Sequence, residues 1–136
     1  MFLQFLAQEW LLAAALLVTV AMLLFHESRR AGRTISPQQA AQLINRHQAV
    51  VIDLRDAAEF RKGHVVGSMN LPFADLKARM GELEALRGRP IVLVCRLGQT
   101  AGSAGKQLAA AGFDPVYRIG GGITEWQHQQ MPLQKR

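Results

Sequence analysis

The only cysteine of the chain, Cys95, follows directly after four apolar residues, Ile91–Val94, three of which are β-branched. A run of this length and composition predicts a buried β-strand. The residues after the cysteine, Arg96–Thr100, are mostly polar or small, and a helical pattern begins at their end. A thiol at such a strand-to-helix turn faces backbone N–H groups and the positive end of a helix dipole, and both favour the thiolate. Cys95 is therefore placed to act as a nucleophile, although the spacing alone fits a buried apolar cysteine equally well.

A single cysteine excludes an internal disulfide and any zinc or iron–sulfur centre built from several thiolates. We expect neither a metal ion nor a cofactor. Any sulfur or disulfide chemistry at Cys95 must finish on another molecule, because the chain has no second thiol. The formal net charge of +6 could indicate nucleic acid, but Arg29, Arg30 and Arg33 lie together directly after an apolar segment. This clustering indicates a membrane surface, and we expect no nucleic-acid partner.

The apolar segment at the N-terminus predicts a transmembrane helix. Residues 10–25 carry no charge, and residues 5–25 would form roughly 31 Å of helix, which matches a hydrocarbon core of about 30 Å. A cleaved secretory signal is the alternative, but no basic residue precedes the apolar run and no small-x-small cleavage site follows it. Lys and Arg are absent before the helix, whereas arginines follow it at once. The positive-inside tendency therefore predicts a single-pass protein of the inner (cytoplasmic) membrane with its C-terminal domain in the cytoplasm, a reducing compartment that suits a free thiol.

The rest of the chain alternates between strand and helix patterns, which predicts an α/β fold with a parallel sheet flanked by helices. We expect strands at about Ile35, at residues 50–54, before Pro72, and at residues 91–94 and 116–119, with helices from Ser36-Pro37 and at residues 57–62, 73–86, 101–111 and 123–129. The expected boundaries are a transmembrane helix at residues 1–25, a basic juxtamembrane linker at 26–34, the α/β domain at 35–132 and a polar tail at 133–136. Sites in parallel sheets form at the carboxyl ends of strands, where Cys95 and Arg55 both fall.

Four motifs in order along the chain resemble the signatures of the single-domain rhodaneses. They are Asp53-Leu54-Arg55 with Glu59-Phe60, then Gly63–Pro72, then the loop Cys95–Thr100, which resembles C-x-x-G-x-[RT], and finally Gly121-Gly122-Ile123 with Trp126. The resemblance runs from about residue 35 to residue 132. Membrane-tethered proteins of this plan are familiar in bacteria.

The resemblance implies a sulfurtransferase. Cys95 would take the outer sulfur of a donor, thiosulfate or a protein persulfide, and pass it to a thiol or cyanide. Arg96, Leu97, Gly98, Gln99 and Thr100 would form the loop that holds the persulfide, with its N–H groups directed at the sulfur. Many family members carry Arg at the sixth loop position, where this chain has Thr100, so thiosulfate affinity could be low and a protein persulfide could be the natural donor.

Other readings of the motifs are weaker. Related phosphatases use C-x5-R, but the position of that arginine holds Ala101, which argues against phosphoryl transfer. Asp53 and Arg55 are supporting candidates that more simply fix the loops at the end of their strand. His64 is expected to be a structural hydrogen-bonding residue, and Trp126 a core aromatic.

Two functions remain open at this stage. The first is a membrane-anchored rhodanese-like sulfurtransferase that works through Cys95. The second is a rhodanese-like binding or scaffold module with little or no turnover, which contacts a membrane-protein partner. The complete loop favours the first, whereas Thr100 and the anchor motivate the second.

Overall fold

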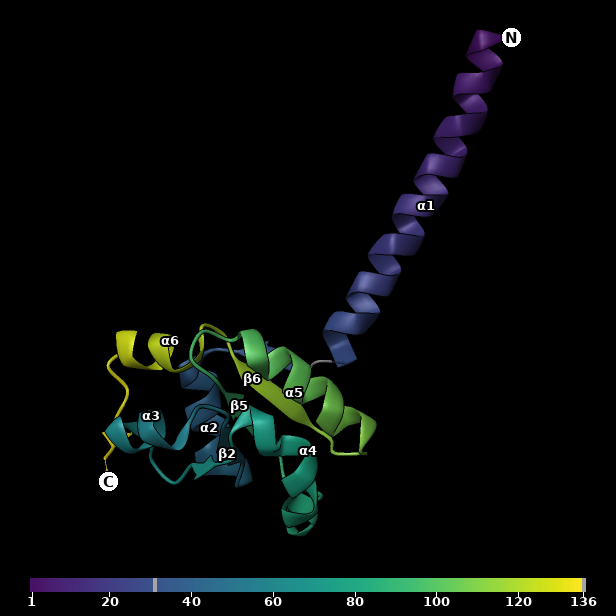
Figure 1. The fold of residues 1–136 in the computed structure, drawn as a ribbon. Helices are drawn as coiled ribbons and strands as arrows, with labels where there is room; N and C mark the ends of the chain where they lie inside the picture. Colours follow the sequence, from purple (N-terminus) through teal and green to yellow (C-terminus); the bar gives the residue numbers. More distant parts are fainter. Residues whose placement is uncertain (31, 136) are drawn as a thin grey trace.

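A computed structural model describes residues 1–30 and 32–135; the side chains of Leu6 and of residues 27–30 lie outside that description. The chain begins with a single long helix, α1 (Phe2–Arg30), that stands clear of the other elements for most of its length (Figure 1). Its segment Phe2–His26 has a mean hydropathy of 1.9, and none of its described side chains is buried. By length and composition this helix is able to cross a membrane, a test that a signal sequence also passes.

The segment predicted as a juxtamembrane linker contains the end of α1 and the start of the first strand. Helix α1 continues to Arg30, through the first part of the segment expected as a linker, and the first strand, β1 (Arg33–Ile35), starts three residues later. Gly32 lies buried between them, with φ +95°, and its carbonyl oxygen accepts a hydrogen bond from Arg118 Nε at 3.1 Å. A Cβ atom at Gly32 would lie 2.8 Å from the carbonyl oxygen of Val116. Gly32 therefore packs against the domain.

The centre of the domain is a sheet of five parallel strands, which confirms the predicted fold class. The strands are β1, β2 (Val50–Asp53), β4 (Met69–Asn70), β5 (Ile91–Val94) and β6 (Val116–Ile119), and their spatial order is β1-β6-β5-β2-β4. All four residues of β5 are buried, as expected for a strand that is covered on both faces. The sheet thus holds β5, and the residue that follows it, at the centre of the domain.

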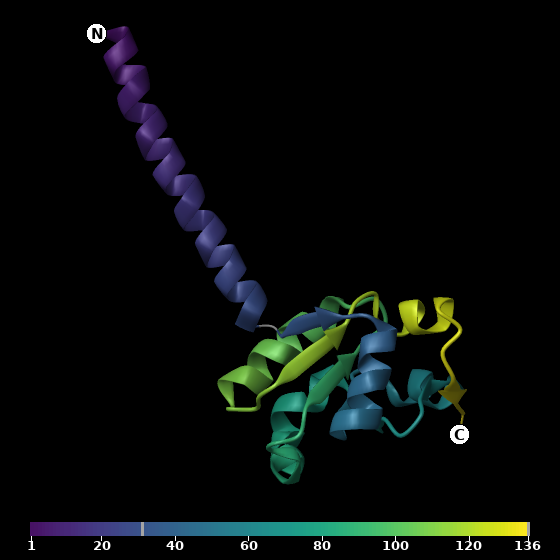
Figure 2. The same ribbon diagram turned by 180° about the vertical axis from the view of Figure 1, so that it is seen from behind.

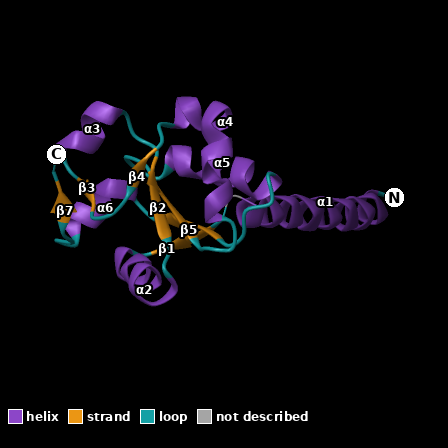
Figure 3. Ribbon diagram, turned by 90° about the horizontal axis from the view of Figure 1, so that it is seen from below, coloured by secondary structure: helices purple, strands orange, loops and turns teal. Residues whose placement is uncertain are grey.

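Helices cover both faces of the sheet (Figure 3). One face packs against α2 (Pro37–His47) and α6 (Gly122–His128), and the other against α4 (Leu76–Arg79) and α5 (Gln99–Ala110). The short helix α3 (Ala57–Lys62) follows β2 as predicted. Ser36 begins α2 as expected: its side chain accepts from Gln39 N while Gln39 Oε1 accepts from Ser36 N.

Two predicted elements differ from the structure. The single helix expected at residues 73–86 is instead a 3₁₀ turn η1 (Phe73–Asp75), the short α4 and a 3₁₀ helix η2 (Met80–Leu86). Gly81 in its middle weakens an α-helix, and the segment still buries Leu76 and Leu83. The expected polar tail contains a strand, β7 (Leu133–Gln134), which pairs antiparallel with β3 (His64–Val65).

Candidate active site

Cys95 directly follows the last residue of β5, Val94, and is only 2% exposed. Its Sγ atom accepts a hydrogen bond from the backbone N–H of Gly98, with the nitrogen 2.9 Å from the sulfur. Gly98 is the N-cap of α5 and has φ +97°, a left-handed conformation that favours glycine. The loop between strand and helix therefore curls back so that the sulfur faces the first turn of α5.

The end of α5 provides further donors on the same side. The first four N–H groups of an α-helix lack helical partners, so those of Gln99, Thr100 and Ala101 point out of the helix beside that of Gly98. The dipole of this twelve-residue helix adds partial positive charge at the same point. Both features favour an anion bound at this end of the helix.

The rim of the loop faces solvent. Arg96 and Gln99 are exposed, Thr100 is half-buried, and the apolar side chain of Leu97 is 57% exposed. The buried sulfur thus lies beneath a rim that offers one cation and one large apolar group. In the part of the chain that the structure describes, no three His, Cys, Asp or Glu side chains gather closely enough to hold a metal ion.

A second segment supports this loop from behind. The N–H of Ile123 donates to the carbonyl oxygen of Cys95 at 2.8 Å, and Thr124 Oγ1 donates to the carbonyl oxygen of Arg96 at 3.0 Å. Gly122 has φ +60°, and a Cβ atom there would overlap the carbonyl oxygens of both loop residues. The glycine turn before α6 is thus the surface on which the loop rests.

Sequence reasoning did not assign this supporting role to Gly122, Ile123 and Thr124. The run Gly120–Gly122 was the available signal, because consecutive glycines often mark a close approach of two backbones. Nothing in the sequence identified the partner of that approach.

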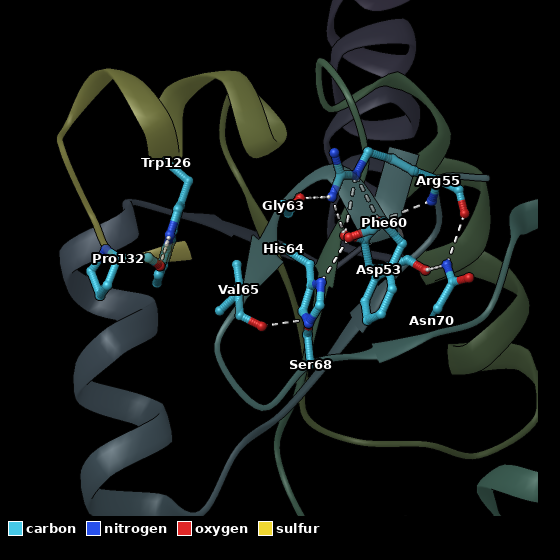
Figure 4. Close-up of polar contacts among 10 residues, drawn as sticks. All are labelled: Asp53, Arg55, Phe60, Gly63, His64, Val65, Ser68, Asn70, Trp126 and Pro132. Carbon is cyan, nitrogen blue, oxygen red and sulfur yellow. Dashed lines mark hydrogen bonds and ion pairs between the residues drawn. The ribbon is translucent and has the colours of Figure 1, made fainter. Parts of the chain in front are cut away.

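Asp53 and Arg55, predicted as supporting residues, form a buried ion pair at the end of β2 (Figure 4). Their side chains are 1% and 8% exposed, and Arg55 Nη2 lies 2.7 Å from Asp53 Oδ2. The same Nη2 donates to the carbonyl oxygen of Gly63 at 2.8 Å, and Asn70 Nδ2 donates to the carbonyl oxygen of Arg55 at 2.9 Å. These contacts hold the segments after β2 together. Asp53 pairs with Val94, so the ion pair lies on the strand next to that of Cys95.

His64 and Trp126 have structural roles, as predicted. His64 Nδ1 is hydrogen-bonded to the carbonyl oxygen of Phe60 at 2.7 Å, and the two rings stack with their centroids 3.7 Å apart (Figure 4). Trp126 is 3% exposed, and its Nε1 donates to the carbonyl oxygen of Pro132 at 3.0 Å. Neither residue is hydrogen-bonded to the cysteine loop in the described part of the chain.

The sheet topology and the cysteine loop agree with a match to the rhodanese-like domain family over residues 36–129, and the chain belongs to that family. Thiosulfate sulfurtransferase GlpE of Pseudoalteromonas translucida (strain TAC 125) is 34% identical over 97 residues, which cover 71% of this chain and 90% of GlpE. The crystal structure of a rhodanese-related protein from Thermoplasma volcanium superposes with a TM-score of 0.70 at 24% identity, covering 76% of this chain and 99% of that one.

A further relative matches more than the domain. The uncharacterized protein YibN of Escherichia coli (strain K12) is 37% identical over 120 residues, covering 88% of this chain and 84% of YibN. A match of 120 residues is longer than the whole segment from residue 36 to the C-terminus. The similarity to YibN therefore extends into α1.

Proposed function

We propose that this protein is a membrane-anchored sulfurtransferase that carries sulfane sulfur as a persulfide on Cys95 and delivers it to a thiol or to cyanide. The observation that carries the proposal is the position of Sγ, 2.9 Å from the N–H donor of Gly98 at the N-terminus of α5. The relationship to GlpE, a thiosulfate sulfurtransferase, supports the same chemistry.

The reaction would proceed in two displacements at the outer sulfur. First, the Cys95 thiolate attacks the outer sulfur of thiosulfate, the sulfur–sulfur bond of the donor breaks, and sulfite leaves with the electron pair. Second, the acceptor thiolate or cyanide attacks the same outer sulfur, and the bond to Sγ breaks to regenerate the thiolate. Neither step needs an oxidant or a reductant. Since the chain has one cysteine, the sulfur must leave on another molecule.

Different residues of the loop would contribute to binding the anion in different ways. The persulfide carries its charge on the outer sulfur, and the N–H groups at the start of α5 are the donors available to it. Gly98 permits the curled backbone, and Arg96 adds a cation at the rim. Thr100 stands where the rhodanese loop signature that this chain resembles also allows arginine, so a small dianion such as thiosulfate would contact one cation fewer. This difference favours a protein persulfide over thiosulfate as donor.

The exposed side chain of Leu97 fits a macromolecular substrate. A large apolar group that is 57% exposed beside the buried sulfur gains free energy when a partner surface covers it. We therefore propose that the donor or the acceptor is a protein. Leu97→Ser is expected to leave transfer from thiosulfate to cyanide within about twofold of the parent, because it removes no N–H donor, and to slow transfer to a protein thiol.

We further propose that α1 anchors the protein in the inner membrane with the domain in the cytoplasm. The helix is long and apolar enough, the arginines follow it, and a reducing compartment keeps Cys95 free. The anchor is tested by carbonate extraction of membranes that contain the full chain, which should leave the protein in the pellet. Release into the supernatant, or a mature protein that lacks the first residues, would refute the anchor and favour a cleaved signal.

The persulfide is tested by intact mass spectrometry of the full chain after incubation with thiosulfate. The parent should gain one sulfur atom on Cys95, and Cys95→Ser should gain none. A matched control is Cys95→Ser with Ser103→Cys, which keeps one thiol per chain at an exposed position of α5. This control should neither hold the sulfur nor turn over. Equal turnover by Cys95→Ser and the parent would refute the proposed chemistry.

The exposed Leu97 also supports the second candidate function, a binding module at the membrane with little turnover. Cross-linking of the full chain in membranes separates the two. A binding module should keep its partners in Cys95→Ser and lose them in Leu97→Ser. A sulfurtransferase should instead transfer one sulfur atom from Cys95 to a thiol of the partner, which mass spectrometry of the partner detects, and Cys95→Ser should transfer none.

A further inference from the structure

A basic pocket of about 260 Å³ lies between β1 and α2, on the face of the sheet opposite to α5. Its polar lining consists of Arg33, Gln39, Gln42, Arg46, His47 and Tyr117. Two guanidinium groups, an imidazole, two amides and a phenol thus surround one cavity. All of these groups can donate hydrogen bonds, and two of them carry a permanent positive charge. Below, the basic pocket means the cavity lined by these six residues.

The residues that line the basic pocket include no Asp or Glu. Among the described side chains, Arg33, Arg46 and His47 form no ion pair. The sequence from Gly32 to Ile52 contains no Asp or Glu, and neither does β6, which supplies Tyr117. By contrast, Arg79 and Arg87 each pair with a glutamate three residues along the chain. Arg33 also lines a neighbouring cavity together with Asp114, but no ion pair joins the two side chains. The basic pocket itself is lined by two arginines and by no acidic residue.

The hydrogen-bond arrangement also favours an anion. Gln39 Oε1 accepts from Ser36 N at 2.9 Å, which occupies that oxygen with the cap of α2 and leaves the amide N–H groups as the free part of the side chain. Guanidinium groups bind phosphate oxygens in pairs, and an ionised partner strengthens each such bond. A phosphate group matches this set of donors better than a neutral or cationic ligand.

The position of the basic pocket relative to α1 indicates where that phosphate comes from. Arg33 follows the last residue of α1, Arg30, by three residues, and three residues span at most about 11 Å. Figure 2 shows β1 at the edge of the sheet beside the base of α1, with α2 on the face towards the viewer. If α1 spans a membrane, Arg33 must lie close to the headgroup layer, within about one Debye length of its anionic surface.

We propose that the basic pocket binds the phosphate of an anionic phospholipid headgroup and so fixes the orientation of the domain on the membrane. This inference rests on the proposed anchor and is independent of the proposed sulfur transfer. Each cation near an anionic surface raises the affinity about fivefold, so removal of both arginines should weaken headgroup binding about 25-fold.

The test is amide hydrogen exchange of the full chain in lipid nanodiscs, read at α2 (Pro37–His47). Discs of phosphatidylcholine are compared with discs that contain phosphatidylglycerol. In the parent, exchange in the last turns of α2 should be at least about fivefold slower in the anionic discs. The double variant Arg33→Gln/Arg46→Gln should lose this difference, whereas the control Arg61→Gln/Lys135→Gln, which removes two exposed cations elsewhere, should keep it.

A third sample distinguishes the two sources of phosphate. Inorganic phosphate added to the parent in phosphatidylcholine discs should not slow exchange; an equal slowing would overturn the lipid assignment in favour of a soluble phosphate compound. No slowing in any sample, or an equal slowing in the double variant, would overturn the pocket itself. Co-elution of the protein with the discs tests the membrane anchor separately. The rate of sulfur transfer in the same samples tests the proposed enzymatic activity. The double variant should keep the parent transfer rate with small substrates, because neither arginine belongs to the cysteine loop.

Discussion

Gly122→Ala should damage both the stability of the domain and sulfur transfer, because the new Cβ atom would overlap the carbonyl oxygens of Cys95 and Arg96. A left-handed backbone costs about 1–2 kcal/mol for a residue other than glycine. Overpacking against neighbours that cannot move away adds about 1–3 kcal/mol. The neighbours here are backbone atoms, so relief requires a shift of the cysteine loop. The expected loss of unfolding free energy is about 2–5 kcal/mol.

Gly67→Ala is the matched control. Gly67 has φ +79°, but no atom lies within 4 Å of the position of its Cβ, so the substitution carries the backbone cost without the overlap. The control should lose about 1–2 kcal/mol of unfolding free energy and keep the parent transfer rate. Stability is measured by urea titration of the full chain in detergent through the fluorescence of the buried Trp126, in a Trp10→Phe background.

The transfer rate of Gly122→Ala is expected to fall about tenfold to 100-fold at a temperature where the domain remains folded, since a displacement of about 1 Å in a reacting group can cost that much. The assay is the initial rate of thiocyanate formation from thiosulfate and cyanide. A Gly122→Ala variant that is no less stable than Gly67→Ala and transfers sulfur at the parent rate would refute the view that the glycine turn positions the thiol.

Three further results are expected. Asp53→Asn should lower the unfolding free energy by about 3–5 kcal/mol, because it leaves the buried guanidinium of Arg55 unpaired. A double-mutant cycle with Arg55→Met should give a coupling energy of about 1 kcal/mol or more. Strict additivity of the two substitutions would contradict the ion pair. Thr124→Val should slow sulfur transfer several-fold, whereas Thr124→Ser, which keeps the hydroxyl, should not. Equal transfer rates in the two variants would mean that the hydroxyl does not hold the loop. Hydrogen bonds from arginine hold the pKa of Glu82 and the pKa of Glu84 below their ordinary range, so the unfolded chain binds these protons at higher pH than the folded chain. The stability from the two pairs should be complete above the ordinary glutamate range and be lost as the pH falls below that range through the lower pKa values of the folded chain. Glu82→Gln/Glu84→Gln should therefore flatten the acid side of the pH–stability curve.

Much of the fold could be predicted because local sequence and tertiary structure agree. The strand at Ile91–Val94 is apolar and β-branched and proves to be buried on both faces. The start of α2 is encoded by a cap that involves only neighbouring residues, Ser36 and Gln39. By contrast, β7 consists of two residues whose only reason to be a strand is their pairing with β3. Such an element has no local signature, since its hydrogen bonds connect distant parts of the chain.

The same distinction applies to the candidate site. Cys95, Gly98 and the start of α5 are neighbours in sequence, so their arrangement followed from a strand, a glycine and a helix in succession. The support from Gly122 and Thr124 depends on the return of the chain to the carboxyl end of β5 after another strand. Sequence reasoning recognised the glycines but had no means of identifying which backbone they approach.

The burial of Cys95 affects which of the two sulfur atoms of a persulfide an incoming thiol can attack. Attack on the outer sulfur delivers that atom, whereas attack on the inner sulfur expels hydrosulfide and joins the two proteins in a mixed disulfide. In the proposed persulfide, the inner sulfur would belong to Cys95, which is 2% exposed and is hydrogen-bonded to Gly98. If the chain is a sulfurtransferase as proposed, steric shielding would suppress the second route, and transfer should occur without release of sulfide. A chain with no other thiol could not reopen that mixed disulfide by itself, and the depth of the sulfur thus protects the protein from its own inactivation.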